Sequence, residues 1–144
     1  MASAKILLAA AAAVAACAPL ATPPPSPAPR GALALHGEAG VPARIGAAFH
    51  TEVARRFTGD TGMEAAAGDL TANGFICSSK GAYPQVKIGE VVAVCELPKP
   101  HGLCSDMWTV DLRLRQVTRA LDFHRVAPEG RFARTCVSGA SPDG

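Results

Sequence analysis

The sequence predicts an α+β protein in which two helices pack on an antiparallel sheet of four to five strands, braced by two disulfides. Apolar residues recur every four positions over residues 41–57, alternating patterns follow Gly74, and four cysteines lie in the same part of the chain. The intervals between the expected strands hold no helical pattern, so the strands should be antiparallel. The helices are expected at the N-terminal end of a single domain over residues 31–144.

Residues 1–16 have the layout of a signal peptide. Lys5 is followed by an apolar run from Ile6 to Ala16, which is shorter than the ~20 residues that a membrane span needs. We expect this segment to direct export.

The residues Val14-Ala15-Ala16-Cys17 resemble the lipobox of bacterial lipoproteins. In that family the chain is cut before the cysteine, which is joined to diacylglycerol, and the new amino terminus is acylated, so the resemblance implies palmitate labelling and a membrane lipid as partner of Cys17. Ala18 follows, where an aspartate commonly retains lipoproteins at the inner membrane; the expected location is the outer membrane, facing the periplasm. Ordinary cleavage at a small-x-small site is the alternative, and it would leave an incidental thiol.

The cysteine count agrees with lipid on Cys17. Five cysteines are an odd number for an exported protein, and lipidation of one leaves four for two disulfides. Four cysteines allow three connectivities, and we favour Cys77–Cys95 with Cys104–Cys136 because Cys77 and Cys95 lie on strands that are consecutive in sequence. The spacing contains no close ligand pair, so zinc is the weaker interpretation and no metal is expected.

Residues 17–30 are expected to form a tether. Six prolines follow Cys17 in this segment, and such a tract favours extended polyproline II geometry, which would reach roughly 40 Å. Without Lys5, thirteen Lys and Arg remain against twelve Asp and Glu, so nucleic acid is not expected as a partner.

Two helices are expected at the start of the domain. Pro42 stands near the first turn of the pattern over residues 41–57. Thr61-Gly62-Met63-Glu64 has the spacing of a capping box, and the second helix should end at Asn73-Gly74.

The strands are expected after Gly74. We place them at Phe75–Cys77, Val91–Leu97, Trp108–Arg115, Arg119–Val126 and Phe132–Val137, with a turn at Pro128-Glu129-Gly130. The third strand alternates, so that one side meets the core and the other meets water. Its water-facing side should carry Thr109, Asp111, Arg113 and Arg115.

The order of lipobox, tether, two helices and antiparallel strands resembles small outer-membrane lipoproteins of the BamE and β-lactamase-inhibitor-like fold, as do the segments Gly74-Phe75-Ile76-Cys77 and Trp108-x-Val110-x-Leu112. The resemblance implies a binding or assembly module without catalysis, and an envelope protein as partner. Our candidate interaction surface is Arg113 and Arg115, for which a solvated sheet face is the simpler interpretation.

A periplasmic inhibitor of a hydrolase such as lysozyme is the alternative function. Lys80-Gly81-Ala82-Tyr83 is similar to a loop of lipoprotein lysozyme inhibitors, although that family is all-β.

The candidates for catalysis are weak. Asp60-Thr61-Gly62 matches the triplet of aspartic proteases, but only one copy is present and Thr61 is better explained as a helix cap. No histidine is spaced in sequence to pair with a nucleophile, and Ser78-Ser79-Lys80-Gly81 is typical of a loop. No nucleotide motif occurs. We therefore predict a protein that is not an enzyme and needs no cofactor. The four histidines are His36, His50, His101 and His124.

Overall fold

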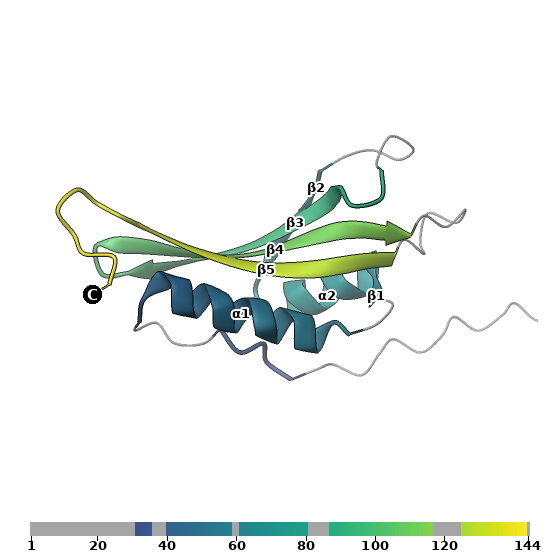
Figure 1. Ribbon diagram of the computed structural model, residues 1–144, viewed down its shortest axis with the longest axis horizontal. Coiled ribbons are helices and arrows are strands. Elements are labelled where there is room, and N and C mark those ends of the chain that lie inside the picture. Colours follow the sequence, from purple (N-terminus) through teal and green to yellow (C-terminus); the bar gives the residue numbers. More distant parts are fainter. Residues whose placement is uncertain (1–30, 36–39, 59–60, 81–86, 117–124, 144) are drawn as a thin grey trace, which may run out of the picture.

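Two helices lie against one face of a five-stranded antiparallel sheet, which is an α+β arrangement (Figure 1). The computed structural model describes residues 31–35, 40–58, 61–80, 87–116 and 125–143. The strand order is β1-β5-β4-β3-β2. In chain order the elements are α1 (Pro42–Arg56), β1 (Thr61–Gly62), α2 (Met63–Ala72), β2 (Ile76–Ser79), β3 (Val91–His101), β4 (Cys104–Gln116) and β5 (Arg125–Cys136).

Helix α1 forms where the four-residue spacing predicted it and packs on β5. Phe49 and Val53 on its inner side are fully buried. Gly130 of β5 lies directly beneath them, and a Cβ atom there would stand 2.8 Å from Val53 Cγ2. The missing side chain at Gly130 therefore allows the helix to contact the strand backbone.

Helix α2 ends as expected but does not begin as expected. Thr61 belongs to the short strand β1 and pairs with Val126, and the N-cap residue is Gly62, which makes no side-chain cap bond. The predicted capping box is therefore wrong, because Thr61 is held by the sheet. At the other end Asn73 caps the helix and Gly74 follows with φ +89°.

The predicted turn at Pro128-Glu129-Gly130 is also wrong, because β5 runs through it from Arg125 to Cys136. Pro128 and Gly130 both fit inside the strand. Gly130 is where α1 contacts the strand. The backbone nitrogen of Pro128 points away from β4, so no N–H is needed there to bond the two strands. Of the strand expected at Arg119–Val126, only residues 125 and 126 are among those described.

The other strands are longer than predicted. β3 continues through Pro98 and Pro100 to His101, and β4 begins at Cys104, so that they form one hairpin. Ser78 and Ser79, expected in a loop, belong to β2.

Both disulfides have the pairing that the strand order predicted. Cys77–Cys95 joins β2 to β3 and Cys104–Cys136 joins β4 to β5, with Cα atoms 3.9 Å apart in each. The bonded residues are direct partners in the register of their strands, so each disulfide holds two neighbouring strands in register.

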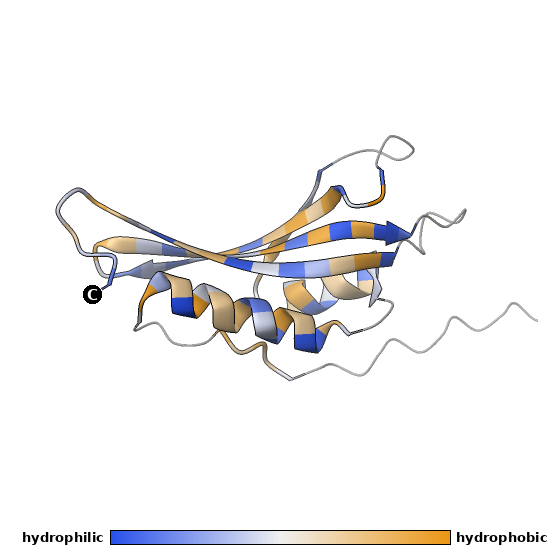
Figure 2. Cartoon of the chain, viewed as in Figure 1, coloured by the Kyte–Doolittle hydropathy of each residue, from blue (hydrophilic) through white to orange (hydrophobic). Residues whose placement is uncertain are grey.

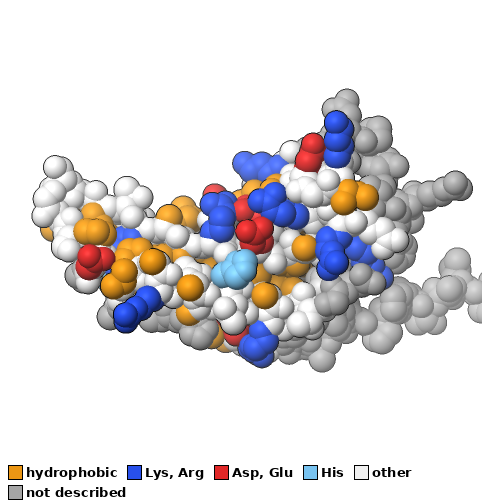
Figure 3. All heavy atoms as spheres, in the orientation of Figure 1, with side chains coloured by type: hydrophobic (Ala, Val, Ile, Leu, Met, Phe, Trp, Pro, Cys, Tyr) orange, Lys and Arg blue, Asp and Glu red, His pale blue; other side chains and the backbone are white. Residues whose placement is uncertain are grey.

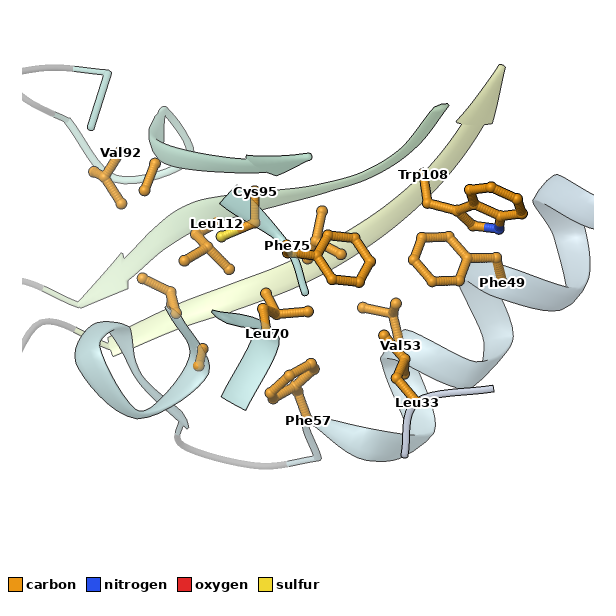
Figure 4. Packing of buried hydrophobic residues seen from close by; sticks show 14 of the residues in the cluster. Leu33, Phe49, Val53, Phe57, Leu70, Phe75, Val92, Cys95, Trp108 and Leu112 are labelled. Carbon is orange, nitrogen blue, oxygen red and sulfur yellow. The ribbon is translucent and has the colours of Figure 1, made fainter. Parts of the chain in front are cut away.

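The core lies between the helices and the sheet (Figure 4). Phe49 of α1 stacks on Phe75, and Trp108 of β4 lies beside Phe132 of β5. The indole Nε1–H of Trp108 donates to the carbonyl of Leu35 at 3.1 Å, which ties residues 31–35 to the domain. Apolar and polar residues alternate along β4 (Figure 2) because only one of its sides faces this core.

Candidate interaction surface

The outer face of the sheet is the side turned away from α1 and α2. No described helix covers it, and the sheet curls so that its ends rise on this side (Figure 1). In register order across β3, β4 and β5, it carries the rows Pro98, Met107 and Ala133; Glu96, Thr109 and Arg131; and Val94, Asp111 and Glu129, with Arg113 beyond them.

Two ion pairs occupy the centre of the outer face. Asp111 and Glu129 stand directly opposite each other in the register, which would repel if they were alone. Arg131 donates to both Asp111 oxygens at 2.6 and 3.0 Å, and Arg113 Nε donates to Glu129 at 2.9 Å. Each carboxylate is therefore neutralised by its own arginine.

The pair of Arg131 and Asp111 closes part of this face to water. Thr109 and Asp111 are only 6 and 5% exposed, so the prediction that they meet water is wrong. The reason is that Arg131, which stands opposite Thr109, extends its guanidinium to Asp111 and covers both. Its hydrogen bonds to Asp111 raise the pKa of Arg131, against the opposing effect of desolvation, so the arginine stays charged.

The two arginines predicted as an interaction surface have different surroundings. Arg113 is half-exposed and bonds both Glu129 and the carbonyl of Gly89. Arg115 is exposed, stands at the register shift of β4 and has no interaction with another described residue. A binding partner would therefore compete with no described residue for the Arg115 side chain but would have to compete with Glu129 for Arg113.

Charges of both signs lie side by side in the middle of Figure 3. Across β3, β4 and β5, the register places three carboxylates and two arginines on the outer face, so this face is not basic. Arg134, which pairs with Asp106, lies on the helix side of the sheet. The carboxylates are Glu96, Asp111 and Glu129, and the arginines are Arg113 and Arg131.

The distal arm, defined as residues 98–107 and 132–137, has an uncharged outer side. Leu103 and Val137 project at its tip, 70 and 57% exposed, and the Val137 N–H donates to the Leu103 carbonyl at 3.1 Å. The disulfide Cys104–Cys136 lies next to them. The arm thus presents apolar side chains at a tip where a disulfide joins its two strands.

A buried ion pair holds the helix side of the distal arm. Arg134 and Asp106 are direct register partners, with N···O distances of 2.6 and 2.9 Å and side-chain exposures of 0 and 1%. Arg134 also donates to the carbonyls of Gly40 and Pro142, while His101 Nδ1 lies 3.8 Å from Asp106. The pair therefore joins the arm to the start of α1 and to the C-terminal segment.

The sequence contained a signal for this pair that we did not use. Opposite residues of an antiparallel pair keep a constant sum of residue numbers, and a disulfide between neighbouring strands fixes that sum. Two residues inward from Cys104 and Cys136 stand Asp106 and Arg134, so pairing the strands through this disulfide places them opposite each other. The prediction did not include this pairing, because it began the third strand only at Trp108.

A hollow of about 340 Å³ lies where the described domain begins, lined by Gly31, Ala32, Arg55 and Arg56. Its arginines bond carboxylates within the domain. Arg55 binds Glu52, and Arg56 binds Asp69 through two N···O contacts of 2.6 and 2.8 Å. Arg56 links the end of α1 to α2 in this way, so these charges serve the helix pair.

The residues weighed for catalysis do not come together where they are described. His50 is exposed on α1 with its Nδ1 3.3 Å from the Gly130 carbonyl, and His101 belongs to the distal arm. Asp60, His36 and His124 lie outside the described residues. Among the residues that are described, no group of three or more His, Cys, Asp or Glu is arranged to bind a metal.

None of the helices in the described ranges is long and apolar enough to cross a membrane. Comparison with known proteins found no matching protein family, no matching curated protein and no matching solved structure.

Proposed function

We propose that the chain is a lipoprotein anchored in the outer membrane through Cys17, with its domain in the periplasm. Residues 1–16 would be the signal peptide, residues 17–30 the lipidated cysteine with its tether, and residues 31–144 the domain, in which two leading helices pack on the sheet. The lipobox-like residues before Cys17 and the prolines after it support this arrangement.

The domain is proposed to act as a non-catalytic interaction or assembly module of the cell envelope. The observation that carries this proposal is the outer face, which no described helix covers while the opposite side of the sheet is packed. Two disulfides and the pairs Arg131–Asp111 and Arg134–Asp106 join the strands that form this face. A surface with mixed charges and an uncharged arm suits a protein partner, because protein interfaces contain both apolar and polar area.

The anchor can be tested with Cys17→Ser. We expect this variant to lose palmitate labelling and to leave the membrane fraction, because the acylated thiol is the proposed attachment. Arg115→Glu, made in the same expression system, should keep both properties and controls for expression and export. Labelling that persists in Cys17→Ser would contradict the anchor.

The partner can be sought by pull-down from detergent-solubilised envelope. Subunits of a membrane complex would support an assembly module, whereas capture of a soluble hydrolase such as lysozyme would favour an inhibitor. Capture of neither class would contradict both functions.

The surface is tested in the same assay with two charge reversals. Arg115→Glu places a negative charge near the end of β4, and Arg44→Glu does so on α1. Both arginines are exposed and neither side chain has an interaction with another described residue, so stability should change little in either variant. We expect capture to fall only with Arg115→Glu, and equal capture by the two would exclude the end of β4 from the surface.

The absence of catalysis has its own test in complementation of a deletion strain. Asp60→Asn, His50→Ala and His124→Ala should each complement fully if these residues have no chemical role. Loss of complementation by a folded variant of this set, with Arg113→Glu and Arg115→Glu together silent, would favour an enzyme.

A further inference from the structure

The edges of the sheet differ in what lies against them, and one of them has no described residue paired with it. On β5, the two residues of β1 pair with one end, and α1 lies against the strand further along. The carbonyl of Gly130 faces His50 of α1 rather than β4, and Pro128, two residues away, points to the same side. Because proline has no N–H, it offers a second chain no donor at that position.

The edge of β3 beyond the end of β2 is also blocked. Pro98 and Pro100 lie there. The residues next to them in β3 form the backbone hydrogen bonds to β4, so the two prolines take the alternate positions. Their nitrogens therefore point outward, and neither can donate to an added strand. The three prolines of the described strands thus stand at positions where an N–H would otherwise face an added strand.

Strand β2 forms the remaining edge and contains neither proline nor charge. The Lys80 N–H donates to Val92 of β3 at 2.8 Å, so alternation places the backbone groups of Cys77 and Ser79 on the outward side. No described residue bonds to these groups. The disulfide Cys77–Cys95 fixes the strand to β3, so little freedom is lost when another strand binds to it.

We propose that β2 pairs antiparallel with β2 of a second copy of this chain, about a two-fold axis at Ser78, so that one sheet continues through both copies. In this register Cys77 stands opposite Ser79 of the second copy. The outward N–H and C=O groups of both residues then bond each other, which satisfies every open group of the edge.

The side chains fit this self-pairing. Ile76 is 72% exposed on the outer face, and in the proposed register it stands opposite Lys80 of the second copy. The stem of that lysine would cover Ile76, and its ammonium would extend toward Glu96, the register partner of Ile76 on β3. The two-fold axis repeats this complementary contact, and no like charges stand opposite each other.

The helix beneath β2 leaves room for the added strand. Thr71 of α2 has its hydroxyl 3.9 Å from the sulfur of Cys77, so α2 runs directly under this edge. Gly68 and Thr71 are both exposed and small. At these two positions of α2, a neighbouring strand would meet no large side chain.

The pairing can be detected with a cysteine at the proposed axis. In the full chain carrying Cys17→Ser, Ser78→Cys introduces the one thiol outside the two disulfides, and it would face its counterpart across the axis. Ser105→Cys is the matched control, because Ser105 is an exposed serine inside the sheet on β4. On oxidation and a non-reducing gel, we expect at least tenfold more dimer from Ser78→Cys than from Ser105→Cys.

A second pair of variants tests the backbone bonds. Ser79→Pro, added to Ser78→Cys, removes an outward N–H as the natural edge prolines do, and should reduce the dimer at least fivefold, while Ser79→Ala should leave it unchanged. Circular dichroism verifies that the proline variant is folded, and if it is not, the comparison of Ser78→Cys with Ser105→Cys decides alone. Equal dimer yields at positions 78 and 105, an undiminished yield in folded Ser79→Pro, or cross-linking in the envelope to a different protein would overturn the proposal. It does not depend on the lipid anchor.

Discussion

The distal and central parts of the β4–β5 pair are joined by the same chemistry in different surroundings. Arg134–Asp106 in the distal arm and Arg131–Asp111 in the centre have almost the same geometry, with two N···O contacts of 2.6 to 3.0 Å each. Their exposures differ, because Arg134 is 0% exposed and Arg131 is 56% exposed. Equal bond lengths therefore do not imply equal contributions to stability, and burial decides between them.

The difference in burial also determines how easily a charged partner could compete for the ion pairs of each region. In the centre, a charged partner can compete for Arg113 or Glu129 at small cost, because water already solvates both side chains. In the distal arm, the same competition would have to unpack Arg134 from the start of α1 and the C-terminal segment. The arm is thus a fixed support, and the centre is the part of the outer face that can exchange contacts.

The largest effect should come from the disulfides. Cys104→Ser with Cys136→Ser is expected to lower the free energy of unfolding by about 4 kcal/mol, and Cys77→Ser with Cys95→Ser by about 3 kcal/mol, in the chain-entropy model. The distal bond closes the longer loop, with a sequence separation of 32 against 18. Urea unfolding of both double variants measures the two values. A larger loss of stability from removing Cys77–Cys95 would show that loop length does not determine which disulfide stabilises the domain more.

The buried pair should come next. Arg134→Met leaves the buried Asp106 charge without its partner and is expected to cost about 3 kcal/mol in the free energy of unfolding. Adding Asp106→Leu should restore part of this loss, since an apolar pair carries no desolvation penalty. Hydrogen bonding to Asp106 raises the pKa of Arg134, so its charge is lost only at a pH above its usual value. We therefore expect the cost, measured by urea unfolding, to stay constant from neutral to mildly alkaline pH.

Much of the fold could be predicted from the sequence because its apolar residues recur at regular intervals. The spacing over residues 41–57 predicted α1, the alternation from Trp108 predicted β4, and consecutive strands predicted the disulfides. The error at Pro128-Glu129-Gly130 came from turn residues whose use depends on neighbours outside the local sequence. Whether proline ends a strand depends on the side to which its nitrogen points, and whether glycine marks a turn depends on what packs against it.

The candidate surface was less predictable for a related reason. Alternation along β4 placed Asp111 and Arg113 on the outer face, but it does not say which arginine of β5 reaches which carboxylate. Those contacts depend on the register, in which Thr109 faces Arg131 and Asp111 faces Glu129. The predicted turn had broken this register, so the balance of charges on the outer face could not be derived.

The pair in the centre should have an intermediate effect. Arg131→Ala removes two charged hydrogen bonds from Asp111, which is 5% exposed and faces Glu129, so the like charges would then repel. We expect a loss of about 1.5 kcal/mol in the free energy of unfolding. Arg131→Lys, which keeps the charge but not the two parallel bonds, should recover about half of it. Full recovery by lysine would show that charge alone matters at this position.

The smallest effect should come from Arg113. Arg113→Ala breaks a pair whose side chains are 43 and 41% exposed, and such pairs are expected to contribute about 0.5 kcal/mol. Because the charges are exposed, salt should screen what remains, and repeating the urea unfolding in about 1 M salt, where the Debye length is near 3 Å, should bring the difference from wild type close to zero. The Arg134→Met difference should persist in the same salt, since water and ions do not reach that pair. A loss for Arg113→Ala as large as that for Arg131→Ala, or equal salt sensitivity at Arg113 and Arg134, would contradict the assignment of the difference between the two regions to burial.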